Sequence, residues 1–334
     1  MHAQHRIARI VLTSGLALLA AASAFGVRRT EDPLALVPAN AATVGVIHWN
    51  ELRSSPLGAQ VFSQMDHVST DGDAARFLAE TGLTPREDID TVVVAMTRPG
   101  AGESGDGLVI FEGRFDLARI SGALVSRGAA KQTGPSGEYY RLADEEGKRD
   151  GAVALVNQSL IVAGSEASVL DALARRESGG AGGLMSGQGL GKQLSRVDRD
   201  ASAWALVDLT KFPATQNRKA HVNVHVDTDD GPSQAIVGVM KSVSLVALQA
   251  KVHGDSVDVS ATGLTDDAEN RGLLADSLRG VLAMWRMAVQ EKSPELVSVL
   301  RQFRVETDSE GVSISGTLPG SFLKTLAAEH RAKK

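Results

Sequence analysis

The 334-residue chain contains no cysteine, which excludes disulfide bonds and thiol-based sites, so its stability must come from packing. Aromatic residues make up only 4% of the chain, and Ala, Val, Leu and Gly therefore supply most of the burial. Lys and Arg form no block apart from a short group at 331–334, and the formal net charge is −5. Because nucleic acids are bound through clustered cations, these absences argue against a nucleic acid partner.

The N-terminal 27 residues have the three parts of a secretory signal. Arg6 and Arg9 precede an uncharged run at 10–27, and residues 22–24 form the small-x-small pattern that signal peptidases cleave. A run of this length also lies at the lower limit for spanning a bilayer, so an uncleaved anchor at 10–27 is a second interpretation and a buried core helix is a third. No Cys follows the run, which excludes a bacterial lipoprotein. We therefore predict an exported bacterial protein in the periplasm or on the outer face of the cytoplasmic membrane.

The rest of the chain has the same pattern twice. After a linker at 28–41, two related α+β repeats are predicted at 42–177 and 195–334, joined by a Gly-rich linker at 178–194. Each repeat opens with a β-rich run, a short polar exit and a proline that can begin a helix. Duplication is therefore the expected internal organisation.

The alternation of apolar and polar residues, together with capping and turn residues, predicts the elements of the first repeat. Strands are expected at 42–49, 91–97, 107–115, 139–142, 152–156 and 160–163. Helices are expected at 57–65, at 74–81 with a stop at Gly82, after the N-cap Asp116, and at 166–176.

The second repeat is expected to begin with a strand at 201–208 and a hairpin formed by 243–252 and 256–262. Asp266 is expected to cap a long helix, with Glu269 at the capping-box position. The buried stripe of that helix is predicted to comprise Leu274, Leu278, Val281 and Trp285. A helix from Pro294, a hairpin formed by 303–306 and 312–317, and a helix at 322–330 complete the repeat.

The element order β-α-β-β-α-β, with an added strand and helix, predicts an α+β fold with mostly antiparallel sheets of the ferredoxin-like kind. Three short patterns add a resemblance: the strand exit Leu52–Pro56, the helix stop within Thr81–Asp90, and the strand Leu160–Gly164 that leads to a helix. With these patterns, the chain resembles uncharacterised exported bacterial proteins that carry domains of unknown function. That resemblance implies an α+β fold and an envelope location, and it implies no catalytic residues.

The best candidate for a metal site is the segment 221–227. In a strand, alternate side chains share a face, so His221, His225 and Asp227 would project together and could ligate Zn²⁺ or Ni²⁺. The alternative is a half-exposed strand with a polar outer face. No motif for a nucleotide or another cofactor is present, and no cofactor is expected.

The long helix of the second repeat carries the other candidate. Met284, Trp285 and Met287 could form a surface for a protein partner or lipid, since methionine side chains adapt to different partners. The alternative is that this helix only covers the sheet.

No nucleophile, acid–base pair or nucleophile elbow is recognisable in the chain. The sequence therefore favours a non-enzymatic binding or scaffolding module of the envelope, with an unknown protein partner. Two alternatives remain open: a periplasmic carrier that holds an apolar ligand between sheet and helix, and an enzyme with an unrecognised site. Contact with the membrane is expected only through residues 10–27, and only if they are not cleaved.

Overall fold

The computed structural model describes residues 32–56, 58, 72–97, 106–143, 150–212, 242–290 and 294–323. The predicted leader, most of the helices expected at 57–65 and 322–330, and the candidate metal ligands His221, His225 and Asp227 lie outside these ranges. The chain divides into two compact units, Met1–Ala205 and Leu206–Lys334.

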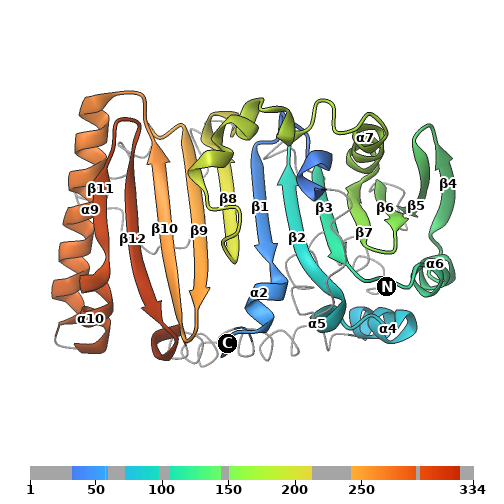
Figure 1. Ribbon diagram of the computed structural model, residues 1–334, viewed down its shortest axis with the longest axis horizontal. Coiled ribbons are helices and arrows are strands. Elements are labelled where there is room, and N and C mark those ends of the chain that lie inside the picture. The colour runs from blue at the N-terminus through green and yellow to red at the C-terminus, as the bar shows by residue number, and fades with distance from the viewer. Residues whose placement is uncertain are drawn as a thin grey trace. The chain divides into compact units, whose positions relative to one another are not determined.

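The first unit contains an antiparallel sheet whose strands follow the order β1-β2-β3-β7-β6-β5-β4 (Figure 1). These strands are β1 (Thr43–His48), β2 (Ile89–Met96), β3 (Gly107–Gly113), β4 (Ala130–Gly134), β5 (Gly137–Ala143), β6 (Asp150–Asn157) and β7 (Leu160–Ser165). The helices are α2 (Trp49–Arg53), α4 (Gly72–Thr81), α5 (Pro85–Asp88), α6 (Leu117–Ser126) and α7 (Glu166–Glu177), with short 3₁₀ helices η1 (Pro33–Leu36), η3 (Leu184–Ser186) and η4 (Gly189–Arg196). Strand β8 (Ala203–Asp208) begins in this unit.

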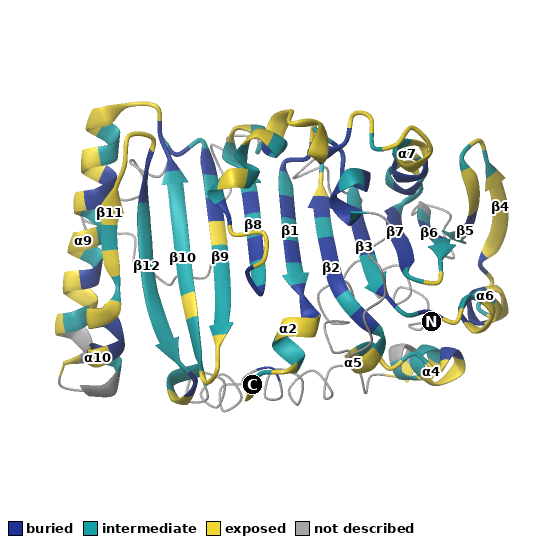
Figure 2. Ribbon diagram, viewed as in Figure 1, coloured by how far each residue is buried: buried dark blue, intermediate teal, exposed yellow. Residues whose placement is uncertain are grey.

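Helices α6 and α7 cover opposite faces of this sheet. Val109 belongs to the core cluster that includes Ile120 and Leu124 of α6, whereas its neighbour Leu108 faces residues of α7. Adjacent residues of a strand point to opposite faces, so the two helices must lie on different sides. Apolar side chains on both faces of β2, β3 and β7 therefore become buried, and these strands are mainly dark blue and teal in Figure 2.

Two adjacent tyrosines of β5 each form a hydrogen bond to one of these two helices. The Tyr140 hydroxyl lies 2.6 Å from the Ser121 hydroxyl of α6, and the Tyr139 hydroxyl donates to Glu166 of α7 at 2.5 Å. The hydrogen bond to the Glu166 carboxylate, together with burial, raises the pKa of Tyr139. The neutral phenol is therefore the form that the fold favours.

We expect Tyr139→Phe to lower the urea midpoint of the first unit at pH 7. Because the pKa of Tyr139 is raised on folding, its contribution is complete below the unfolded pKa of about 10 and is lost as pH rises through the folded value. The difference between the wild type and Tyr139→Phe should therefore shrink above about pH 10. A difference that stayed constant with pH would mean that ionisation of the Tyr139 phenol is not linked to folding.

The second unit contains an antiparallel sheet with the order β11-β12-β10-β9, and its described residues include the helices α9 and α10 (Figure 1). Its elements are η5 (Leu209–Lys211), β9 (Leu245–His253), β10 (Ser256–Leu264), α9 (Ala268–Val289), α10 (Pro294–Gln302), β11 (Arg304–Thr307) and β12 (Gly311–Pro319). Helix α9 contacts β11 and β12, and a small core forms where Leu274 and Ala275 meet Val243 and Val312. Leu274 also fills the space above Gly263 of β10.

Helix α9 begins one residue later than its capping pattern predicts. The N-cap is Asp267 and not Asp266: the Asp267 carboxylate accepts hydrogen bonds from the backbone N–H groups of Glu269 and Asn270. Asp267 has the extended backbone that an N-cap requires, at φ −102° and ψ 132°. Glu269 is therefore too close to the cap to complete a capping box.

We expect Asp267→Ala to lower the free energy of unfolding of the second unit by about 1 kcal/mol, the usual cost of losing an N-cap. The matched variant Asp266→Ala removes the same group from the adjacent exposed position and should change stability little. Urea unfolding followed by tryptophan fluorescence provides the measurement, and the part of the signal that is lost in a Trp285→Phe background reports on this unit. A larger loss of stability for Asp266→Ala than for Asp267→Ala would mean that Asp266 is the N-cap.

The predicted fold class is confirmed, since the structure is α+β with antiparallel sheets. Local signals also hold: α4 ends before Gly82, which adopts φ +64°, and the Asp116 side chain caps α6. The element order hairpin, helix, hairpin occurs in both units, with β2-β3-β7-β6 arranged in its sheet like β9-β10-β12-β11. Duplication of the chain itself stays a prediction.

The segments predicted as linkers lie partly inside the first unit. In the range 28–41, η1 buries Leu34 and Leu36, and the following Val37 is fully buried. In the range 178–194, Leu184 of η3 and Leu190 of η4 are buried. Apolar side chains thus fold both segments onto the sheet, although Gly and Pro interrupt regular structure there. Among the described residues, no helix is long and apolar enough to cross a membrane.

Candidate functional site

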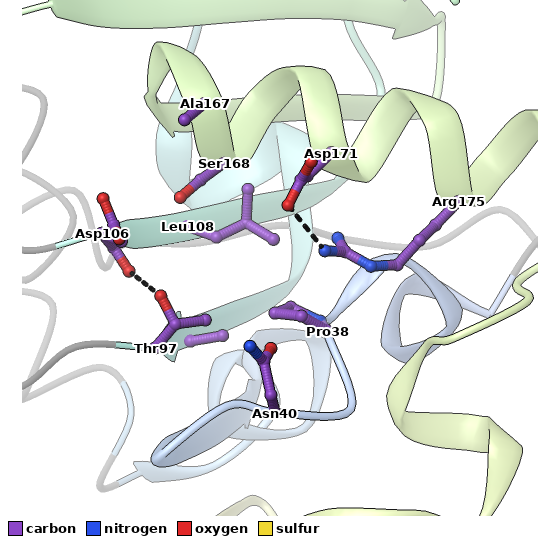
Figure 3. Close-up of a pocket in the computed structure, with 10 residues that line it drawn as sticks. Pro38, Asn40, Thr97, Asp106, Leu108, Ala167, Ser168, Asp171 and Arg175 are labelled. Carbon is purple, nitrogen blue, oxygen red and sulfur yellow. Dashed lines mark hydrogen bonds and ion pairs between the residues drawn. The ribbon is translucent and has the colours of Figure 1, made fainter. Parts of the chain in front are cut away.

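A cavity of about 170 Å³ lies in the first unit between the segment after η1, the edge of β2 and β3, and helix α7 (Figure 3). It is lined by Pro38, Asn40, Ala95, Thr97, Asp106, Leu108, Ala167, Ser168, Asp171 and Arg175. Six of these ten residues are polar or charged. The cavity therefore has a mixed lining of polar and apolar surface.

Backbone hydrogen bonds fix the walls of the cavity. Thr97 and Asp106 close the ends of β2 and β3, since both the amide and the hydroxyl of Thr97 donate to the Asp106 carbonyl, at 3.1 and 3.3 Å. The chain around Pro38 is held by Ala39 N–H donating to the Gly182 carbonyl at 3.0 Å and by Leu184 N–H donating to the Val37 carbonyl at 2.7 Å. The cavity is thus built into the fold.

Arg175 is a largely buried charged side chain of the cavity. One terminal nitrogen donates to the Leu36 carbonyl at 3.0 Å, and the other lies 3.3 Å from the Asp171 carboxylate one turn earlier on α7. Its side chain is 14% exposed, and burial lowers its pKa while Asp171 partly compensates. Arg175 therefore joins α7 to η1 and places a partly desolvated charge at one end of the cavity.

The described residues contain no group of three or more His, Asp or Glu side chains that could hold a metal ion. His48 is buried at the end of β1, with Nδ1 2.7 Å from the Ala201 carbonyl. Because a carbonyl can only accept, Nδ1 carries the proton in this pair. His48 thus fixes the start of β8 within the first unit.

The second candidate surface is on α9, in the other unit. Leu273, Met284 and Met287 are 50%, 43% and 66% exposed. Separations of 11 and 14 residues are close to three and four helical turns, so these three side chains share one face of the helix. We call the surface formed by Leu273, Gly280, Met284 and Met287 the α9 stripe. The surface above Gly280 is open, because a Cβ added there would meet no atom within 4 Å. The exposed positions along α9 are visible in Figure 2.

Trp285 does not belong to the buried stripe that the helical period predicts, because it is 51% exposed. It follows Leu278 by two turns and so projects from the same side of α9 as Leu274, which is buried. The sheet covers that side of α9 near Leu274 and does not enclose it at Trp285. The three predicted surface residues are thus all exposed, but Trp285 lies on a different side from Met284 and Met287.

No protein-family model and no curated protein matches this chain. Among solved structures, it is similar to crystal forms III, IV and I of the bacterial protein TP0453, with TM-scores of 0.48, 0.45 and 0.45 and identities of 10%, 10% and 9%. The matches cover 90%, 89% and 90% of this chain and 100%, 96% and 99% of the TP0453 chain. At this level the similarity carries no argument about function.

Proposed function

We propose that this protein is a non-enzymatic binding module of the bacterial envelope, and that the α9 stripe docks into an apolar groove of a protein partner. The exposure of Leu273, Met284 and Met287 on one face of a helix carries this proposal. Single exposed apolar residues are ordinary, but three aligned over four turns match the anchor pattern of a helix that lies in a groove. Gly280 at the centre would let the partner approach the backbone closely.

The charges along α9 favour a protein over an anionic membrane surface. Helices that lie on membranes have a polar face rich in Lys and Arg. On α9, by contrast, an exposed acid stands next to an exposed base, since Arg279 forms an ion pair with Asp276 at 2.9 Å. Mixed charges of this kind are typical of the rim of a protein interface.

The alternative of an apolar-ligand carrier receives no support from the cavity. A carrier needs a chamber lined mainly by apolar side chains. The cavity of the first unit has a mixed lining instead, with Pro38, Ala95, Leu108 and Ala167 as the apolar residues among the described ones. The location of the module in the envelope is part of the proposal and depends on the leader at 1–27, either as a cleaved signal or as an anchor.

A unique cysteine can test the docking surface, because the native chain has none. We would place a photo-crosslinker on Met287→Cys and on Met185→Cys, a methionine that is 41% exposed in the first unit. In cells that make the protein naturally, Met287→Cys should crosslink to one discrete protein, and Met185→Cys should not. The same products from both positions, or crosslinks to lipid alone at Met287, would contradict the proposal.

A further inference from the structure

The sheet of the second unit has one apolar and one polar side. Opposite residues of an antiparallel pair share a side, and the register places Leu248 of β9 opposite Ala261 of β10. Two residues further along β9, Ala250 lies opposite Val259. The position between them holds the polar Gln249, which projects to the other side. We call the apolar surface formed by Leu248, Ala250, Val257, Val259 and Ala261 the β9–β10 face.

Helices α9 and α10 lie on this apolar side, and in the described part of the unit they contact mainly β11 and β12. Leu274 of α9 lies over Gly263 at the end of β10, and the Phe303 ring lies over Gly316 of β12. Both glycines are on the same side as the β9–β10 face, by the alternation along β10 and its register with β12. Leu248 is 41% exposed, and the other residues of the face are half-buried (Figure 2).

An antiparallel sheet commonly buries its apolar side and leaves its polar side to water. The β9–β10 face therefore has the composition of a surface that is built to be covered. The same unit also presents the α9 stripe, an apolar helix surface that needs an apolar surface to dock on.

We propose that the partner of the α9 stripe is a second copy of this chain, whose β9–β10 face receives the stripe. The stripe of the second copy covers the β9–β10 face of the first in return. The two contacts are then equivalent by two-fold symmetry. This inference rests on the proposed function, because it names the partner of the same surface.

The α9 stripe points away from its own sheet, as the arrangement requires. Two residues correspond to about 200° around a helix, so Gly280 is nearly opposite Leu278 and Met284 is nearly opposite Leu282. Leu278 packs against the core that α9 forms with the sheet, and Leu282 is buried. One side of α9 thus contacts its own sheet, and the other side can contact the sheet of a second copy.

The two surfaces also match in length and chemistry. From Leu273 to Met287 the stripe is about 21 Å long, at 1.5 Å per residue. Strands β9 and β10 have nine residues each, which corresponds to about 27 Å. Neither surface contains a charged residue, and Asp276 and Arg279 beside the stripe form an ion pair within the helix. A second copy can therefore cover the stripe along its whole length.

The association is measured by sedimentation velocity over the micromolar range, on protein purified from the cells that make it naturally. We expect the wild type to form a dimer. Leu248→Glu and Met287→Glu should each raise the dissociation constant about 30-fold, because symmetry places each substitution at the interface twice. Met185→Glu is the matched control in the first unit, since Met185 is also 41% exposed, and it should change nothing. A wild type that stays monomeric, or a folded Leu248→Glu that dimerises as tightly as the wild type, would overturn the inference.

Crosslinking between two single-cysteine variants tests which surfaces meet. Leu248→Cys and Met284→Cys, with different tags, are mixed and treated with a short bis-maleimide, which is specific because the native chain has no cysteine. The mixed product should exceed the product of either variant with itself, because the two Met284 side chains of a dimer point to opposite sheets. Products formed mainly by one variant with itself would contradict this arrangement. If the purified protein is monomeric and Met287→Cys captures a different protein in cells, the second copy is wrong as the partner while the proposed docking surface stands.

Discussion

Replacing Gly164 with Ala is expected to lower the free energy of unfolding of the first unit by about 3 kcal/mol, at the upper end of the usual cost of overpacking. Gly164 lies in β7, paired with Leu108 of β3. A Cβ at this position would stand 2.2 Å from the carbonyl oxygen of Gly107, a backbone atom that cannot turn aside as a side chain could. The variant must therefore separate β3 from β7 at the centre of the sheet, next to the cavity.

Gly151→Ala is the matched control for Gly164→Ala. Gly151 lies in the adjoining strand β6, where an added Cβ would have Leu142 Cβ as its nearest atom at 3.6 Å, an ordinary contact. This substitution should change stability by less than about 0.5 kcal/mol, because it also reduces the freedom of the unfolded chain.

Urea unfolding of both variants can be followed in a Trp285→Phe background. The remaining tryptophans, Trp49 and Trp204, are buried in the first unit, so their fluorescence follows that unit separately. Equal midpoints for Gly164→Ala and Gly151→Ala would mean that β3 and β7 do not approach as closely as described.

Replacing Arg175 with Ala is expected to cost about 2 kcal/mol, the range of a hydrogen bond made by a charged group that leaves its partner unsatisfied. The guanidinium is the link between α7 and the Leu36 carbonyl of η1, and Leu36 and Val37 are buried beside it. Without this link, the segment 32–41 should open more readily. Hydrogen exchange of the amides around Leu36 would show the change directly.

Arg176→Ala is the control for Arg175→Ala. Arg176 is the next residue of α7, is exposed and does not line the cavity. Its replacement should leave both the urea midpoint and the exchange of the η1 amides close to the wild type. Comparable losses for both arginines would assign the effect to the helix as a whole and not to the contact with η1.

Features that depend on residues close together in the sequence could be predicted from the sequence. The end of α4 at Gly82 and the cap at Asp116 follow from local conformational preference and local hydrogen bonds. By contrast, β4 was not expected, because Ala130–Thr133 are all exposed and lack the apolar alternation that identifies a strand. Its pairing with β5 determines its structure, and pairing is a tertiary property.

The candidate sites mark the limit of this kind of prediction. The helical period correctly placed Trp285 on the same side of α9 as Leu274, but it cannot show where the sheet stops covering that side. The cavity was missed because its lining comes from four separate segments of the chain. The only local signal was the Asp171 and Arg175 pair, four residues apart on α7, and such pairs are common on exposed helices.

The proposed docking surface is tested most directly by the affinity of the purified protein for the protein that Met287→Cys captures. The double variant Met284→Glu and Met287→Glu should weaken that affinity about 30-fold, at about 1 kcal/mol for each anchor side chain. Both side chains are exposed, so the unfolding midpoint should not change, and Met185→Glu should affect neither quantity. A folded double variant that binds the captured protein as tightly as the wild type would contradict the proposal that the α9 stripe is the partner surface.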